Sequence, residues 1–91
     1  MIYVTMTDKF LSGWGHAKNK INKLVFECAT RAEAAIIVDN AINRTDQKSI
    51  SICVNFPYHY NQPQYYTQVK TIKEYPSWYI PGYFKDRKAA I

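Results

Sequence analysis

Residues 30–42, with the sequence TRAEAAIIVDNAI, decide the fold class of this chain. The stretch begins with Thr30 and places Glu33 three residues later, which is the capping-box pattern at the start of a helix. Apolar side chains then recur at spacings of three and four residues, which puts them on one stripe of that helix. The stripe consists of Ala34, Ile37, Val38, Ala41 and Ile42. We therefore predict one amphipathic helix that begins after Thr30, fades near Arg44 and ends at Thr45-Asp46.

Four segments outside this helix have the pattern or composition of β-strands. Apolar and polar residues alternate over residues 2–7 and 49–54, which is the period of a half-buried strand. Residues 24–28 form a further predicted strand, with Leu24, Phe26 and Cys28 on one face and Val25 and Glu27 on the other. Residues 65–73 are rich in β-forming residues and mix polar with apolar side chains on both faces, as an edge strand does. The predicted order is β-β-α-β-β. The fold class is therefore α+β: a small ββαββ domain, residues 1–91, in which one amphipathic helix packs on an antiparallel or mixed sheet.

The C-terminal stretch 75–84 is rich in aromatic side chains around a Pro81-Gly82 turn. Exposing so many rings together is costly, so we expect this aromatic tail to fold back on the domain. One helix covers only one face of a sheet, and the tail, a second copy of the chain or a partner would have to cover the other. We expect Trp78 to pack on the sheet and Tyr83 and Phe84 to form a partner or homodimer surface.

Charge and composition narrow the range of partners and locations. The net charge of +5 favours nucleic acid, phosphorylated ligands or acidic protein surfaces. No stretch approaches the ~20 apolar residues of a membrane span, and the N-terminus lacks the pattern of a signal peptide. Cys28 and Cys53 each lie in an apolar run, as buried reduced thiols do. We expect a cytoplasmic protein without membrane contact.

The sequence carries no recognisable catalytic or cofactor-binding pattern. The segment Gly13-Trp14-Gly15 lacks the Gly-Lys-Ser/Thr ending of a phosphate-binding loop and the third glycine of a dinucleotide fingerprint. The side chains that commonly hold metals, Cys28, Cys53, His16 and His59, are scattered singly without paired spacing. No two carboxylates are placed as an acid/base pair. We therefore expect a protein that is not an enzyme, needs no metal or cofactor, and acts by binding.

Two basic and aromatic stretches are the candidate binding surfaces. The first runs from Lys9 to Lys23 without an acidic residue, and the second runs from Lys70 to Lys88. Basic side chains neutralise phosphates, while rings stack on bases or anchor protein interfaces. A solvated lysine loop with an aromatic mini-core explains the same residues equally well. The candidate binding residues are Lys9, Trp14, His16, Lys18, Lys20, Lys23, Tyr58, Tyr60, Tyr79, Tyr83, Phe84 and Lys85.

The opening residues 2–15 (IYVTMTDKFLSGWG) and the closing residues 78–85 (WYIPGYFK) resemble a group of small accessory proteins of bacteriophages and related mobile elements. The resemblance runs over most of the chain and assigns no role to any residue. Many such proteins disable host enzymes or defence complexes such as CRISPR effectors, and others bind nucleic acids or nucleotide signals. The resemblance therefore implies a non-catalytic, anti-CRISPR-like inhibitor that binds a host defence protein or nucleoprotein complex. The alternative is a small basic module that binds nucleic acid or a nucleotide signal.

Overall fold

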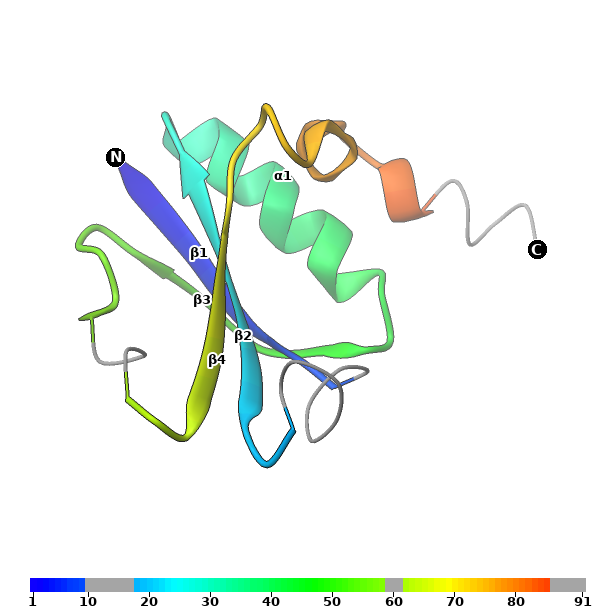
Figure 1. The fold of residues 1–91 in the computed structure, drawn as a ribbon. Helices are drawn as coiled ribbons and strands as arrows, with labels where there is room; N and C mark the ends of the chain where they lie inside the picture. The colour runs from blue at the N-terminus through cyan, green and yellow to red at the C-terminus, as the bar shows by residue number, and fades with distance from the viewer. Residues whose placement is uncertain (10–17, 59–61, 86–91) are drawn as a thin grey trace.

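The computed structural model describes residues 1–9, 18–58 and 62–85. Figure 1 shows the elements, which are β1 (Ile2–Asp8), β2 (Ile21–Cys28), α1 (Arg31–Ile42), β3 (Gln47–Cys53), β4 (Tyr65–Lys70) and the short 3-10 helix η3 (Pro76–Tyr79). The predicted α+β class and the ββαββ order are confirmed. The strand ends differ from the prediction by one to three residues.

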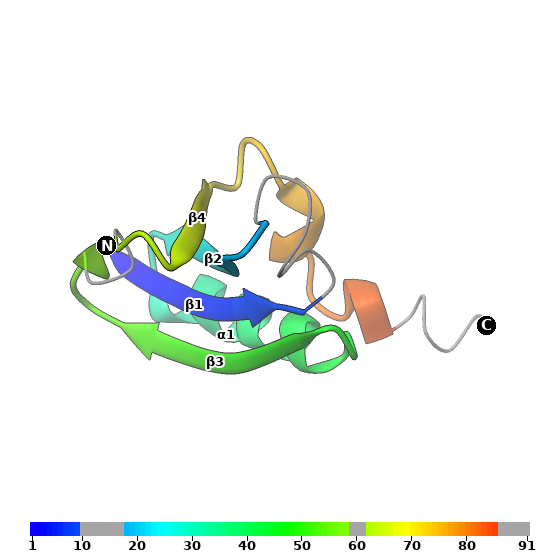
Figure 2. The same ribbon diagram turned by 60° about the horizontal axis from the view of Figure 1, so that its bottom comes forward.

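The four strands form one mixed sheet in the order β3-β1-β2-β4. The strand β1 pairs antiparallel with both β2 and β3, whereas β4 lies parallel to β2. The helix α1 packs against one face of this sheet, as Figures 1 and 2 show from two sides. The other face, which we call the open face, has no helix among the described residues. The strands β1 and β2 are central, and β3 and β4 are the two edges.

The helix begins as the capping box predicts. The backbone N–H of Glu33 donates to Thr30 Oγ1 at 3.2 Å, and the backbone N–H of Ala29 donates to Glu33 Oε2 at 2.7 Å. The helix ends three residues before the predicted end, at Ile42, whose side chain is 67% exposed and so does not extend the apolar stripe. The stripe residues that are fully buried against the sheet are Ala34, Ile37 and Ala41.

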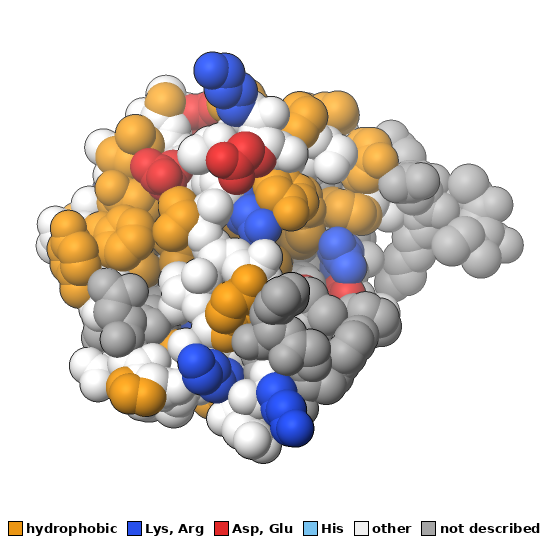
Figure 3. All heavy atoms as spheres, in the orientation of Figure 1, with side chains coloured by type: hydrophobic (Ala, Val, Ile, Leu, Met, Phe, Trp, Pro, Cys, Tyr) orange, Lys and Arg blue, Asp and Glu red, His pale blue; other side chains and the backbone are white. Residues whose placement is uncertain are grey.

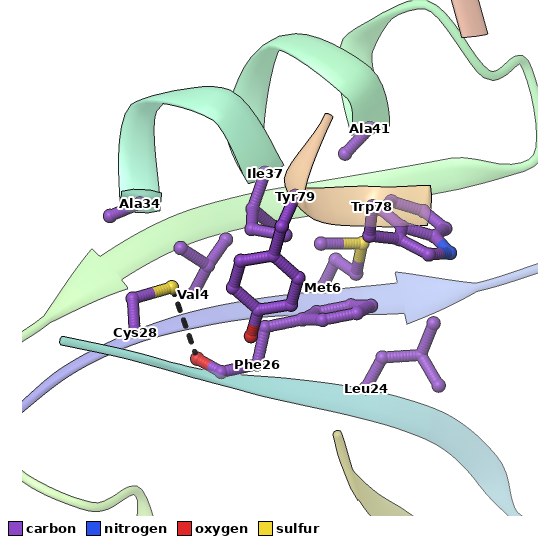
Figure 4. Close-up of a cluster of buried hydrophobic side chains, with 10 residues drawn as sticks. All are labelled: Val4, Met6, Leu24, Phe26, Cys28, Ala34, Ile37, Ala41, Trp78 and Tyr79. Carbon is purple, nitrogen blue, oxygen red and sulfur yellow. Dashed lines mark hydrogen bonds between the residues drawn. The ribbon is translucent and has the colours of Figure 1, made fainter. Parts of the chain in front are cut away.

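The hydrophobic core lies between α1 and the sheet, and Figure 4 shows its side chains. Its centre is Phe26 of β2, whose ring centroid lies 4.8 Å from that of Trp78 and 6.5 Å from that of Tyr79. The predicted packing of Trp78 on the sheet is confirmed. The aromatic tail lies beside α1 on the helix-covered face, and therefore it does not cover the open face. The core residues are Val4, Met6, Leu24, Phe26, Cys28, Ala34, Ile37, Ala41, Trp78 and Tyr79.

A buried amide on α1 fastens the tail to the helix. Asn40 Nδ2 donates to the backbone oxygens of Trp78 and Ile80, each at 2.9 Å, and the Asn40 side chain is fully buried. These two carbonyls lie where η3 ends, and without a donor they would be desolvated at a cost. Asn40 therefore links the aromatic tail to the core.

We expect Asn40→Leu to lower the free energy of unfolding by about 2–3 kcal/mol. The change removes the donor of both hydrogen bonds while nearly preserving side-chain volume, so two buried carbonyls lose their partner. Urea unfolding followed by circular dichroism measures the loss. Asn43→Leu is the matched control, because the Asn43 side chain donates to the Asp39 carbonyl at the exposed end of the helix. Equal losses in the two variants would contradict a special role for Asn40.

The ends of the tail also pack onto the domain. The Phe84 ring centroid lies 4.9 Å from that of Trp78, and the Arg44 guanidinium lies 5.3 Å from the Trp78 ring and 5.1 Å from the Phe84 ring. Arg44 also bonds both carboxylate oxygens of Asp46, at 2.9 and 2.5 Å. Burial alone would raise the pKa of Asp46, but these hydrogen bonds and the charge of Arg44 outweigh it and lower that pKa. This packing favours the mini-core interpretation for Phe84.

Candidate anion-binding site

The open face is divided into two unlike ends. The alternation along β1 directs Tyr3, Thr5 and Thr7 to this face, since Val4 and Met6 point into the core. At the Tyr3 end, rings from the β3–β4 connection pack on the sheet: the Tyr3 and Phe56 centroids are 5.4 Å apart, and those of Phe56 and Tyr58 are 4.9 Å apart. The end near Thr7 is hollowed.

This hollow, the lysine cavity, has a volume of about 410 Å³ and is lined by Thr7, Lys9, Ile21, Lys23, Lys48, Ser49 and Tyr65. All four strands contribute because β1 ends here and the other three begin here. Thr7 pairs with Lys23 on one side and with Lys48 on the other. Cross-strand partners project their side chains from the same face, so the two lysines flank Thr7. In Figure 3, Lys and Arg side chains lie at the bottom of the view as well as at its top and centre, and hydrophobic side chains gather on its left.

The lysine cavity concentrates positive charge. Three lysines line it, and no Asp or Glu of the described residues does. Lys23 is only 8% exposed, its Nζ donates to Thr7 Oγ1 at 2.6 Å, and that Nζ lies 5.8 Å from the Tyr65 ring centroid. Burial lowers the pKa of Lys23, Tyr65 partly opposes this, and the positive charge of Lys48 lowers it further. An anion between Lys23 and Lys48 would relieve both unfavourable effects.

A β-bulge puts Lys48 into the cavity. Thr5 pairs with Ser51, yet Thr7 pairs with Lys48, so Met6 faces two residues of β3 instead of one. Had the first register continued, Lys48 would face Asp8 and its side chain would lie on the helix side of the sheet. Ser49, within the bulge, has a φ of 56°, an uncommon conformation for a residue other than glycine. Bulges and strained residues of this kind are frequent at functional sites.

A second, smaller hollow lies on the helix side of the sheet, with a volume of about 130 Å³. It has mixed charge, because Asp8 lines it together with Arg44 and Lys70. Lys70 Nζ already donates to Gln68 Oε1 and to the Tyr75 hydroxyl, each at 2.9 Å. The lysine cavity is therefore the stronger candidate for binding an anion.

Of the basic residues predicted for binding, Lys9 and Lys23 line the lysine cavity. The backbone N–H of Lys9 donates to the Asp46 carbonyl at 2.8 Å, which ties the end of β1 to the start of β3. Lys18 and Lys20 are exposed but do not line the cavity. Lys85 is exposed beyond η3, far along the chain from the cavity residues.

The predicted aromatic residues are distributed over different parts of the molecule. Tyr58 is 72% exposed at the ring-covered end of the open face. Tyr83 and Phe84 are half-buried in the tail, with centroids 5.0 Å apart. The candidates Trp14, His16 and Tyr60 lie outside the described residues.

The placement of Tyr79 at a binding surface is wrong for this fold. Its ring packs on Phe26, and its hydroxyl donates to the backbone oxygen of Glu27 at 2.7 Å. Burial raises the pKa of Tyr79 above its ordinary value, with smaller contributions from Cys28 and nearby carboxylates. The side chain is only 7% exposed, so it is a core residue. The sequence did not predict this burial, because η3 is a single turn and is too short to show a periodic pattern of apolar residues.

Sequence reasoning missed five of the cavity residues, namely Thr7, Ile21, Lys48, Ser49 and Tyr65. They come from four separate strands, and each is unremarkable beside its neighbours in the chain. The basic run from Lys9 to Lys23 supplies only part of the site. The remaining residues are brought together by the register of the strands, which cannot be predicted from a local sequence pattern.

Other kinds of site find less support. Within residues 1–9, 18–58 and 62–85, no three His, Cys, Asp or Glu side chains lie close enough together to hold a metal ion. In the same ranges, no helix has the length and apolar character needed to cross a membrane. Burial raises the pKa of the Cys28 thiol to about 11, and burial also raises the pKa of Cys53.

Comparison with protein-family models, curated proteins and solved structures found no match for this chain.

Proposed function

We propose that this protein is a non-catalytic binding protein whose lysine cavity holds a phosphate-bearing ligand. The observation that carries the proposal is the lysine cavity itself: Lys9, Lys23 and Lys48 meet around a hollow that no carboxylate of the described residues lines. Ammonium groups are strong partners for phosphate oxygens. The cavity supports the alternative in which the protein binds nucleic acid or a nucleotide signal.

The energetic arrangement of the cavity supports a binding role. The burial of Lys23 and its repulsion with Lys48 both lower the pKa of Lys23, and both disfavour its charged form in the folded chain. The positive φ of Ser49 adds a strain of roughly 1–3 kcal/mol. Unfavourable features grouped in one hollow are typical of sites at which stability is given up for binding.

Tripolyphosphate, a compact polyanion without a base, tests the proposal. We expect it to bind to the protein with an affinity that decreases as salt is added, because the attraction is between charges. Lys48→Ala should weaken this binding about tenfold, a loss typical of a charge-assisted contact. Isothermal titration calorimetry measures the affinity at several salt concentrations.

Lys73→Ala is the matched control for Lys48→Ala. It removes the same charge from an exposed position in the turn after β4 that does not line the cavity. We expect its affinity for tripolyphosphate to equal that of the unchanged protein. Failure of tripolyphosphate to bind, or equal losses in the two variants, would sink the proposal.

A cytoplasmic site of action belongs to the same proposal. Both cysteines are free thiols, Cys28 in the core and Cys53 half-buried on β3. Free thiols fit a reducing compartment, where disulfides are rare.

The second candidate is an inhibitor that docks on a host defence protein, as the resemblance to phage accessory proteins implies. The favouring observation is the ring cluster of Tyr3, Phe56 and Tyr58, beside which Val54 is 60% exposed. Exposed rings are enriched at protein interfaces. In a pull-down from nuclease-treated host lysate, this candidate requires a protein that Lys48→Ala still captures and Tyr58→Asp does not. A captured protein that depends on Lys48 alone would contradict it.

A further inference from the structure

We infer that the ligand of the lysine cavity is a phosphorylated nucleoside, with its phosphates between Lys23 and Lys48 and its base against the Tyr65 ring. This inference rests on the proposed function and names the substrate class of the same site. It comes from the two unlike walls of the cavity.

One wall of the cavity is charged and the other is apolar. Lys48 and Lys9 lie on the side of β1 and β3, whereas Ile21 and Tyr65 are register partners on β2 and β4. Parallel register partners project from the same face, so Ile21 and Tyr65 stand side by side. Ile21 is 40% exposed, which is high for an isoleucine at the start of a central strand. A phosphate alone uses only the charged wall, while a nucleoside phosphate uses both.

Lys23 connects the two walls. Its Nζ donates to Thr7 Oγ1 at 2.6 Å on the charged side and lies 5.8 Å from the Tyr65 ring centroid on the apolar side. If the phosphate of a ligand bonds to Lys23, the base of the same ligand is therefore close enough to contact the Tyr65 ring. Base stacking on an aromatic ring next to a cation is a recurring way to bind nucleotides.

The size of the hollow agrees with a small organic ligand. Its volume of about 410 Å³ lies within the range of ~300–1,000 Å³ that is usual for such sites. A single phosphate would leave most of this space unused. The Tyr3, Phe56 and Tyr58 rings occupy the other end of the open face, so the face does not form a continuous track for a long backbone. A free nucleotide, or the phosphorylated end of a strand, fits this arrangement better than the interior of a duplex does.

The test compares ligands with and without a base on variants of Tyr65. Isothermal titration calorimetry is run with the four common nucleoside triphosphates, with tripolyphosphate and with adenosine. We expect the best triphosphate to bind about tenfold tighter than tripolyphosphate, and adenosine to bind far more weakly than either, since stacking adds to the charge contacts. Tyr65→Leu should remove that tenfold advantage, so that the triphosphate and tripolyphosphate bind to the variant with similar affinity. Tyr65→Phe keeps the ring and should keep the advantage.

The outcomes separate this inference from the proposed function. If tripolyphosphate binds as tightly as every triphosphate, or if Tyr65→Leu weakens both ligands equally, the nucleoside is not recognised and only the inference fails. If neither ligand binds, the proposed function fails with it. Competition with a 5′-phosphorylated single-stranded oligonucleotide, and with the same oligonucleotide without the phosphate, then shows whether the natural ligand is a strand end or a free nucleotide. Competition by the phosphorylated form alone assigns a strand end, and competition by neither assigns a free nucleotide; both results support the inference.

Discussion

Truncation of the chain after Glu74 should abolish the cooperative unfolding transition of this domain. The deletion removes Trp78 and Tyr79, which together form one side of the core around Phe26. Each such ring buries ~150–250 Å², and replacing a buried Phe or Trp by Ala typically costs 3–5 kcal/mol. Small domains are stabilised by only about 5–15 kcal/mol in total. The loss of both rings, and of the Asn40 hydrogen bonds, is therefore comparable with the whole stability.

Point variants test the same prediction without removing chain. Trp78→Ala should lower the free energy of unfolding by about 3–5 kcal/mol. Ile80→Ala, two residues further along, should lower it by less than ~1 kcal/mol, because the Ile80 side chain is 49% exposed and the hydrogen bond from Asn40 is made to its backbone oxygen. Thermal and urea unfolding followed by circular dichroism measure both. A truncated chain that unfolds as cooperatively as the full chain would show that the tail is dispensable for folding.

Lys23→Met should abolish anion binding in the lysine cavity while leaving the domain as stable as before, or more stable. Met keeps an unbranched side chain and removes the ammonium that burial and Lys48 make unfavourable. Thr7 loses one donor, but its hydroxyl remains able to donate a hydrogen bond itself. Lys23→Arg, which keeps the charge, is the matched variant and should keep measurable binding of tripolyphosphate.

The pH dependence gives Lys23→Met a second signature. The pKa of Lys23 is lower in the folded chain than the ordinary value of 10.5, so between these two values the unfolded chain binds more protons. The free energy of unfolding of the unchanged protein should therefore rise with pH across that window, and this contribution should be missing from Lys23→Met. Anion affinity should fall over the same window, because the neutral amine no longer attracts phosphate. A Lys23→Met protein that unfolds, or that binds tripolyphosphate normally, would contradict a binding role for this residue.

Local patterns in the sequence predicted the secondary structure because their causes are local. The Thr30–Glu33 cap and the stripe of Ala34, Ile37 and Ala41 depend on the geometry of a few consecutive residues. The alternation along β1 likewise follows from the pleat of a single strand. The packing of Trp78 was predictable from the cost of exposing its ring in so small a domain.

Local sequence patterns could not predict which side of the sheet the tail covers. Asn40 interrupts the apolar pattern of the helix and looks like a surface residue, yet it is fully buried and bonds the Trp78 and Ile80 carbonyls. Its partners lie 38 and 40 residues away in the chain. A buried polar residue is stable only with such partners, and a one-dimensional pattern cannot identify them. The same limit explains why Tyr79 was assigned to a surface.

By itself, the sequence determined that the chain forms an α+β domain, where its helix begins, and that basic and aromatic side chains dominate its candidate contacts. Only the tertiary structure decided which of these side chains meet. Lys48 enters the lysine cavity because one extra residue at Ser49 shifts the register of β3 against β1. Tyr65 reaches Lys23 because β4 lies parallel to β2. Strand register and strand order arise from contacts between distant segments, and a shift of one residue moves a side chain to the opposite face of the sheet.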